Sequence, residues 1–149
     1  METHGIKPPT YLLIAIIVMI VFHFVLPVLF LIPAPWTLLG LIPLILGILI
    51  NIGADQVFHR VNTPVSPFEA SSVLVTCGPY RFSRNPMYLG FLLILLGSSI
   101  LLGSLTSFAM VPAFGLLMDR TFVRMEEGKM AATFGAAWTG YKSQTRRWL

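Results

Sequence analysis

The sequence has few charged residues for its length. Only 11% of its 149 residues are Asp, Glu, Lys or Arg, whereas 56% are hydrophobic, and its mean hydropathy is +0.81. A soluble domain has roughly 25% charged residues, and a chain this small has too little interior to bury so much apolar surface away from water. The composition therefore indicates that lipid surrounds much of the chain.

Cysteine and the common catalytic motifs are also scarce. The single cysteine, Cys77, excludes an internal disulfide and a cysteine-rich metal cluster. The sequence contains no Ser-His-Asp set, glycine-rich phosphate loop or zinc-ligand spacing. Asn51, Asp55 and His59 would share one helix face, but three such residues are too few for a metal site, so we favour a polar helix end. Although the net charge is +4, the basic residues flank apolar blocks, which does not favour nucleic acid as a partner.

Apolar residues gather in four blocks, and a helix that crosses a bilayer needs about 20 of them. We predict one all-α domain over residues 1–149, an integral membrane helical bundle with spans at about 11–32, 36–54, 86–104 and 105–122. The first block follows Lys7 and so resembles a signal peptide, but it is too long and lacks a clear cleavage site. His23 inside it is either functional or hydrogen-bonded to a neighbouring helix, and we favour the second interpretation.

The positions of the basic residues predict the orientation. All ten Lys and Arg residues lie outside the two short turns around Ala34 and Ser104. With four spans they all fall on one side, which the positive-inside rule makes cytoplasmic. We expect an integral protein of a bacterial plasma membrane with both termini in the cytoplasm. A polar ligand would then bind two cytoplasmic segments, at about residues 62–88 and 120–149.

Small residues recur every seven positions on two of the predicted spans. They are Gly40, Gly47 and Ala54 on the second span, and Gly90, Gly97 and Ser104 on the third. Seven residues make two helical turns, so each set predicts a groove in which a neighbouring backbone can approach closely.

The segment CGPYRFSRNPMYLG is the densest in polar groups. Gly78-Pro79 predicts a turn, and Pro86 suits the first turn of the third helix. The helix N-terminus, whose free N–H groups and dipole favour an anion, would then gather Arg81, Arg84, Asn85 and Tyr88. Either a carboxylate or phosphate ligand binds there, or the arginines only anchor the helix to lipid headgroups.

Two of the six acidic residues are adjacent, at Glu126 and Glu127. They follow the fourth span, where Glu127 is three residues from Arg124 and could pair with it. The residues alone favour a solvated amphipathic helix, and the alternative is a site for a cationic ligand. The ending FGAAWTGYKSQTRRWL mixes aromatic and basic residues and suits the headgroup interface or a lateral entrance for a lipid-like substrate.

Taken together, GPYR-x-x-RNPMYLG, the EE pair, FG-x-x-W-x-x-Y and the terminal TRRWL resemble the isoprenylcysteine carboxyl methyltransferase and phospholipid methyltransferase superfamily. The resemblance runs from about Asn62 to Leu149. It implies methyl transfer from S-adenosylmethionine to a lipophilic acceptor (a carboxylate, amine or thiol) at the cytoplasmic membrane face, with membrane lipids as surroundings.

The resemblance also implies which residues contact the cofactor: Ser72, Val73, Leu74, Val75, Tyr80, Arg84, Asn85, Pro86, Met87, Tyr88, Glu126 and Glu127. Several family members have His at the position of Asn85, so an acid–base role there is not expected. The basic residue that positions an acceptor carboxylate in the prenylcysteine enzymes has no match in spacing, and Arg120 and Arg124 are the candidates.

Two other functions are compatible with parts of the sequence. An NADPH-dependent sterol-type membrane reductase has a similar arginine-containing turn and a similar G-x-x-W-x-x-Y ending. A non-enzymatic membrane scaffold would need only the spans. The Glu126-Glu127 pair and the RNPMYLG segment favour the methyltransferase.

Overall fold

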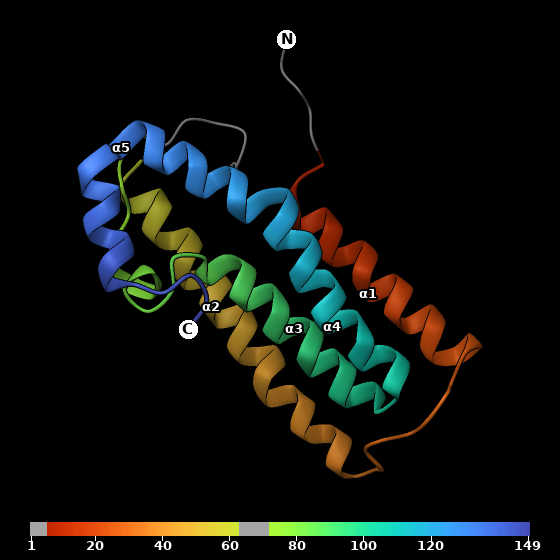
Figure 1. The fold of residues 1–149 in the computed structure, drawn as a ribbon. Helices are drawn as coiled ribbons and strands as arrows, with labels where there is room; N and C mark the ends of the chain where they lie inside the picture. The colour runs from red at the N-terminus through yellow and green to blue at the C-terminus, as the bar shows by residue number, and fades with distance from the viewer. Residues whose placement is uncertain (1–5, 63–71) are drawn as a thin grey trace.

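A computed structural model describes residues 6–62 and 72–149, and their regular structure is helical (Figure 1). The elements in order are α1 (Pro8–Val25), the 3₁₀ turn η1 (Trp36–Gly40), α2 (Leu41–Arg60), the 3₁₀ turn η2 (Gly78–Arg81), α3 (Pro86–Leu102), α4 (Leu105–Met118), the π-helical turn η3 (Asp119–Val123) and α5 (Arg124–Gln144). Within the described residues, one isolated bridge between Phe30 and Ser104 is the only β-type pairing. The all-α prediction is confirmed.

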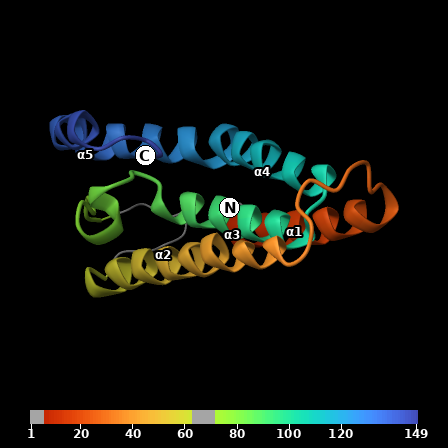
Figure 2. The ribbon, with the colours of Figure 1, turned by 90° about the horizontal axis from the view of Figure 1, so that it is seen from below.

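The helices form a bundle whose outer faces are apolar. Helix α3 lies centrally and packs against α1, α2 and α4, while α4 and α5 form a row on the side away from α2 (Figure 2). Pro8–Val25 and Trp36–Arg60 are long and apolar enough to cross a bilayer, and only 17% of each apolar window is buried. A soluble core helix of this composition would be mostly buried, because water disfavours its side chains. These exposed apolar faces suit lipid, as expected for an integral membrane bundle.

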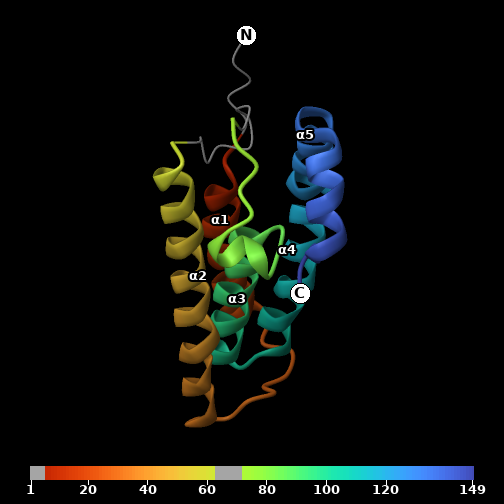
Figure 3. The ribbon, with the colours of Figure 1, turned by 90° about the vertical axis from the view of Figure 1, so that its left-hand side faces the viewer.

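The first helix is shorter than the predicted span, because it ends at Val25 rather than near Ile32. Pro27 has no N–H for a helical hydrogen bond and disfavours helix in the residue before it. The chain then runs to the turn between α3 and α4, where the N–H of Leu31 donates to the carbonyl of Gly103 at 2.7 Å. The two turns without Lys or Arg therefore meet at one end of the bundle, and the polar segments lie at the other (Figure 3).

Helices α2 and α3 pack backbone to backbone through the small residues noted in the sequence. A Cβ atom on Gly47 would lie 2.5 Å from the carbonyl oxygen of Gly90, and one on Gly97 would lie 2.5 Å from that of Gly40. No side chain fits at these distances. The two predicted grooves face each other, which confirms them as packing positions.

His23 is hydrogen-bonded at the end of the bundle where the two turns lack Lys and Arg. Its Nδ1 lies 2.9 Å from the hydroxyl of Ser104, the residue that caps the N-terminus of α4. This contact confirms the interpretation of His23 as a hydrogen-bonded residue between helices.

The last helix bends back on itself at Gly135, where φ is 48° and ψ is −115°. Only glycine adopts this backbone conformation without strain. Gly140, five residues further along, remains helical. The bend returns the second half of α5, and the C-terminus after it, to the start of α3 (Figures 1 and 3).

Candidate functional site

The turn before α3 is held against the inner face of α2. A Cβ atom on Gly53 of α2 would lie 3.5 Å from the Cγ of Pro79, and Tyr80 is buried with Ala54 and Val75. From the other side, the hydroxyl of Tyr141 donates to the carbonyl of Tyr80 at 2.6 Å. Tyr80 is therefore enclosed between α2 and the returning half of α5.

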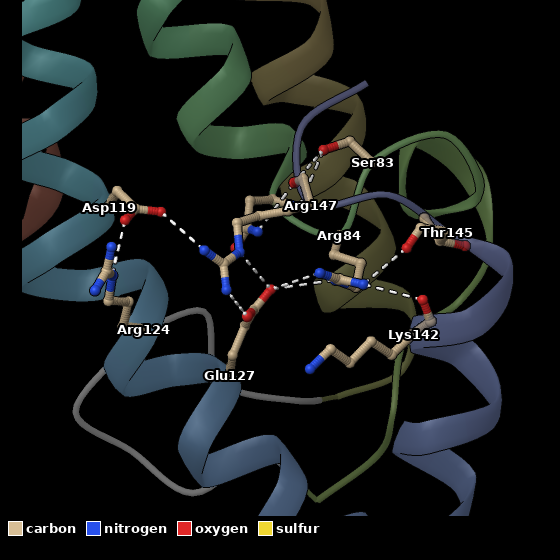
Figure 4. A network of polar contacts seen from close by, with 9 residues as sticks. Ser83, Arg84, Asp119, Arg124, Glu127, Lys142, Thr145 and Arg147 are labelled. Carbon is tan, nitrogen blue, oxygen red and sulfur yellow. Dashed lines mark hydrogen bonds and ion pairs between the residues drawn. The ribbon is translucent and has the colours of Figure 1, made fainter.

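The guanidinium of Arg84 is bound by other groups of the protein (Figure 4). Its Nε and Nη2 each lie 3.1 Å from Oε1 of Glu127, and its Nη1 donates to the carbonyls of Lys142 and Thr145 at 3.1 and 2.9 Å. Its side chain is 8% exposed, and its guanidinium lies 5.8 Å from the ring centroid of Trp138. The anion expected near the start of α3 is thus present as a carboxylate of the protein itself.

A second arginine, Arg147, binds the same carboxylate. Its Nη2 lies 2.6 Å from Oε2 of Glu127, and its Nη1 lies 3.4 Å from Asp119. Arg124 binds Asp119 at 2.9 Å, so the pairing of Glu127 with Arg124 that the sequence suggested is not formed. In the structure Glu127 faces α3 and the C-terminus, whereas Arg124 faces the π-helical turn (Figure 4).

Glu126 has a different environment from Glu127. The hydroxyl of Tyr88 donates to its Oε1 at 2.5 Å, and the Tyr88 ring stacks on Phe122. Burial raises the pKa of Glu126 to about 7, and the hydrogen bond from Tyr88 and the charge of Lys129 oppose this increase. Burial, and after it the charge of Glu126, also raises the pKa of the Tyr80 phenol. Glu126 therefore lies in a poorly solvated region lined by phenols.

Among the carboxylate side chains of residues 6–62 and 72–149, Glu126 alone has no Lys, Arg or His nitrogen of those ranges within ion-pair distance. Asp55 lies 3.2 Å from the imidazole of His59, which is charged only when protonated. Asp119 pairs with Arg124 and Arg147, and Glu127 pairs with Arg84 and Arg147. A buried carboxylate is unfavourable unless it is neutralised or paired. The site therefore provides an electrostatic environment that suits a cation.

The structure brings together most of the residues that the resemblance indicated. Tyr80, Arg84, Asn85, Tyr88, Glu126 and Glu127 converge where the turn, α3 and α5 meet. Pro86 is buried there, Met87 packs beside Tyr80, and the amide of Asn85 donates to the carbonyl of Arg147 at 3.1 Å. These contacts define one candidate site.

The other indicated residues lie further out. Residues 72–75 are irregular, with a bend at Ser72 and Val73; Val75 is buried, and Ser72 and Val73 are exposed. Arg120 and Arg124 are exposed on the π-helical turn and the start of α5. Asn51 donates to the carbonyl of Gly47, and the described residues contain no group of three metal-ligating side chains.

Asp119 and Arg147 also belong to this site, and neither was predicted from the sequence to do so. Arg147 belongs to the TRRWL segment, which we expected to meet lipid, and its position depends on the bend at Gly135. The number of charged residues gives a partial signal of these roles. Two adjacent glutamates lie close to several arginines, so specific ion pairs must form among them.

Two comparisons with known proteins found a match. A model of the phospholipid methyltransferase family matches residues 36–137, which is more than half of the chain. The solved structure of a eukaryotic intramembrane Ras methyltransferase, an isoprenylcysteine carboxyl methyltransferase, is similar with a TM-score of 0.71 and 29% sequence identity. The match covers 92% of this chain and 50% of that one, so this chain spans about half the length of that protein. The search of curated proteins found no match.

Proposed function

Because the chain belongs to the phospholipid methyltransferase family, we propose that it transfers a methyl group from S-adenosylmethionine to a lipophilic acceptor at the cytoplasmic face of a plasma membrane. One observation carries the cofactor assignment. Glu126 is a half-buried carboxylate that accepts a hydrogen bond from Tyr88 and forms no ion pair within the described residues. A ligand with positive charge would stabilise it.

The residues of the site fit this cofactor. When bound, S-adenosylmethionine supplies a methyl group on a positively charged sulfur, beside a positively charged ammonium. Glu126 would bind the cationic side of the ligand, and Tyr88 would orient the carboxylate. Tyr80 and Trp138, both buried, provide aromatic surface for the remainder of the cofactor.

Methyl transfer needs alignment and the exclusion of water more than it needs acid–base chemistry. Holding two reactants in line can contribute roughly 7–11 kcal/mol to lowering the barrier. The returning half of α5 covers the turn through the bond from Tyr141 to Tyr80. This cover would exclude water from one side of the site.

The acceptor would enter from the bilayer. An apolar groove lies between α1 and α4, lined by Ile14, Ala15, Val18, Met110, Ala113, Phe114 and Leu117, and Tyr11 lies at its end. The Tyr11 ring contacts Phe122, which stacks on Tyr88. This chain of rings supports the groove as a route by which an apolar tail brings its polar end to the site.

The charge of the acceptor determines what the residues must do. An amine acceptor must lose a proton to a base, and Glu126 is not available as that base while it binds the cationic groups of the cofactor. A carboxylate acceptor needs no base but does need a cation. Of the two arginines we expected to position it, Arg124 is bound to Asp119, which makes Arg120 the better candidate.

The reductase alternative fits this charge arrangement less well. NADPH carries phosphates, which bind cationic side chains and N–H groups. Arg84 and Arg147 are already paired with Glu127 and Asp119, and the nearby Glu126 would repel a phosphate.

Titration of the purified protein with S-adenosylhomocysteine and with NADPH tests the proposal. We expect S-adenosylhomocysteine to bind, and Glu126→Gln to weaken binding by about 10-fold or more, as for a lost charge-assisted hydrogen bond. Arg146→Gln, which changes an exposed side chain, is the matched control and should bind as the parent does. Binding of NADPH without S-adenosylhomocysteine would contradict the proposal.

The acceptor can be identified separately. Membranes containing the protein would be incubated with radiolabelled S-adenosylmethionine, and the labelled product extracted into the lipid phase and identified. Label confined to the aqueous phase would rule out a lipophilic acceptor.

A further inference from the structure

The C-terminus is fastened to the start of α3. We call residues 145–148 the C-terminal strap. The N–H of Arg84 donates to the carbonyl of Arg146 at 2.9 Å, and the hydroxyl of Ser83 and the amide of Asn85 both donate to the carbonyl of Arg147 at 3.1 Å. Trp148 packs against the main core. The backbone of the strap therefore fixes where the Arg147 guanidinium lies (Figure 4).

Glu127 lies between two arginines and binds both of them. Its oxygens accept from Nε of Arg84 at 3.1 Å and from Nε and Nη2 of Arg147 at 3.2 and 2.6 Å. Nη2 of Arg84 also lies 3.1 Å from Oε1 of Glu127. With its bonds to the carbonyls of Lys142 and Thr145, Arg84 has a partner for each of its three nitrogens.

This pairing separates the charges of two neighbouring glutamates. Successive residues on an α-helix point about 100° apart, so Glu127 reaches the arginines while Glu126 reaches Tyr88. Without Glu127, the buried Arg84 would lack a carboxylate, and a buried charge requires a counter-ion. Glu126 is the adjacent carboxylate, and Arg84 would then compete with any cation for it.

We propose that Glu127 is a positioning residue: held by Arg147 of the C-terminal strap, it retains Arg84 and so leaves Glu126 open to the cationic groups of the cofactor. This inference rests on the proposed function, because it assumes that Glu126 binds S-adenosylmethionine. Glu127 itself does not contact the ligand. Its role is to determine which carboxylate of the pair is available.

The test compares two ligands on the full-length protein in detergent micelles. S-adenosylmethionine carries both cationic groups, whereas 5′-methylthioadenosine shares the nucleoside and sulfur but carries neither. The preference is the ratio of their dissociation constants, measured by calorimetry for the parent, Glu127→Gln, Arg84→Gln, the double variant and the control Arg146→Gln. Thermal unfolding of each variant measures whether it is folded.

We expect Glu127→Gln to reduce the preference by about 10-fold or more, because Arg84 then occupies Glu126. Arg84→Gln and Arg146→Gln should keep the preference of the parent. The double variant should recover it, since Arg84 is gone and Arg147 keeps its pairing with Asp119. A merely structural role for Glu127 would instead weaken both ligands equally in the single and the double variant, and that result would overturn the inference.

Arg84→Gln keeps the inference testable even if Glu127→Gln does not fold. A loss of preference in Arg84→Gln would mean that Arg84 contacts the ligand directly, and it would overturn the inference. If the parent binds neither ligand, the proposed function itself fails. A different result would leave the proposed function intact. If the parent binds S-adenosylmethionine and Glu126→Gln loses the preference, but Glu127→Gln has the same preference as Arg146→Gln, only the positioning role of Glu127 fails.

Discussion

Glu126 and Glu127 are adjacent in the sequence, but their side chains are stabilised in different ways. Glu127 accepts charge-assisted hydrogen bonds from two arginines, which are stronger than bonds between neutral groups. Glu126 accepts one hydrogen bond from a phenol, and burial raises its pKa to about 7. The first residue contributes to the fold through these bonds, whereas the second is proposed to bind a cationic ligand.

The raised pKa of Glu126 predicts how the stability of the ligand-free protein depends on pH. Its folded-state pKa of about 7 lies above the ordinary value of 4.5, so the folded protein binds the proton more tightly than the unfolded chain. This stability is present below the ordinary value and is lost as the pH rises through 7. Between pH 4.5 and 7.5 we expect the melting temperature of the parent to fall by roughly 5 °C more than that of Glu126→Gln.

Thermal unfolding across this pH range, monitored by circular dichroism, measures the difference. Tyr80, Tyr88 and Lys129 are the titratable groups that act on Glu126. Arg146→Gln should follow the parent. Parallel curves for the parent and Glu126→Gln would show that Glu126 titrates as an ordinary exposed glutamate.

Binding of a cationic ligand should show the opposite dependence on pH. Deprotonation of Glu126 creates the charge that the ligand needs, so affinity for S-adenosylmethionine should increase as the pH rises from 6 to 8. The expected change is about 10-fold, since binding is coupled to the loss of one proton near pH 7. Calorimetry at several pH values checks this, and Glu126→Gln should remove the dependence.

At the scale of the element, the bend at Gly135 determines whether the site is covered. Gly135→Ala places a side chain where φ is 48° and ψ is −115°, at a cost of about 1–3 kcal/mol. We expect the bend to open, with weaker binding of S-adenosylhomocysteine and loss of the bond from Tyr141 to Tyr80. Gly140→Ala is the matched control, because Gly140 is helical and has open space around it; equal binding by the two variants would mean that the bend does not serve the site.

The packing of α2 on α3 gives a second comparison within one helix. A Cβ on Gly47 would lie 2.5 Å from the backbone of Gly90, whereas the nearest atom to a Cβ on Gly53 is 3.5 Å away. Alanine favours helix over glycine by about 1 kcal/mol, but overpacking costs about 1–3 kcal/mol. Gly47→Ala should therefore lower the melting temperature in detergent and Gly53→Ala should not; similar temperatures would mean that the helices can move apart freely.

The sequence predicts local features of this fold better than features that depend on two distant segments. The grooves at Gly47 and Gly90 and the turn at Gly78 follow from local rules of packing and backbone geometry. The partner of Arg84 does not, because Glu127 and Arg147 reach it only after α5 bends at Gly135 and the strap returns. An ion-pair rule of three or four residues along a helix suggested Arg124 for Glu127, and the tertiary contact is formed instead.

The end of the first span was also misplaced, for a related reason. Composition measures whether a segment is apolar, and residues 26–32 are apolar. This segment contains Pro27, and the N–H groups of Leu31 and Ile32 near its end bind the carbonyl of Gly103. Its apolar character therefore suits the end of the bundle rather than a helix. Hydropathy identifies which residues meet lipid but not which of them are helical.

At the scale of the whole molecule, the two ends of the bundle differ in charge and in structure. One end holds the turns at 26–35 and 103–104, without Lys or Arg, and the other holds the candidate site with its arginines. A bilayer with a positive-inside bias would place the second end in the cytoplasm. The two ends therefore predict opposite accessibility to a reagent that cannot cross the membrane.

Cysteine labelling in intact bacterial cells tests this orientation, because the chain has a single cysteine to remove. In a Cys77→Ser background, Ala34→Cys and Ser143→Cys each place a thiol at an exposed position, one at each end. We expect a membrane-impermeant maleimide to label the cysteine at position 34 in intact cells, and to label the one at position 143 only after the cells are permeabilised. The Cys77→Ser background alone should remain unlabelled. The reverse pattern would place the arginines, Glu126 and the proposed cofactor site outside the cytoplasm, where S-adenosylmethionine is not supplied, and would contradict both the orientation and the function.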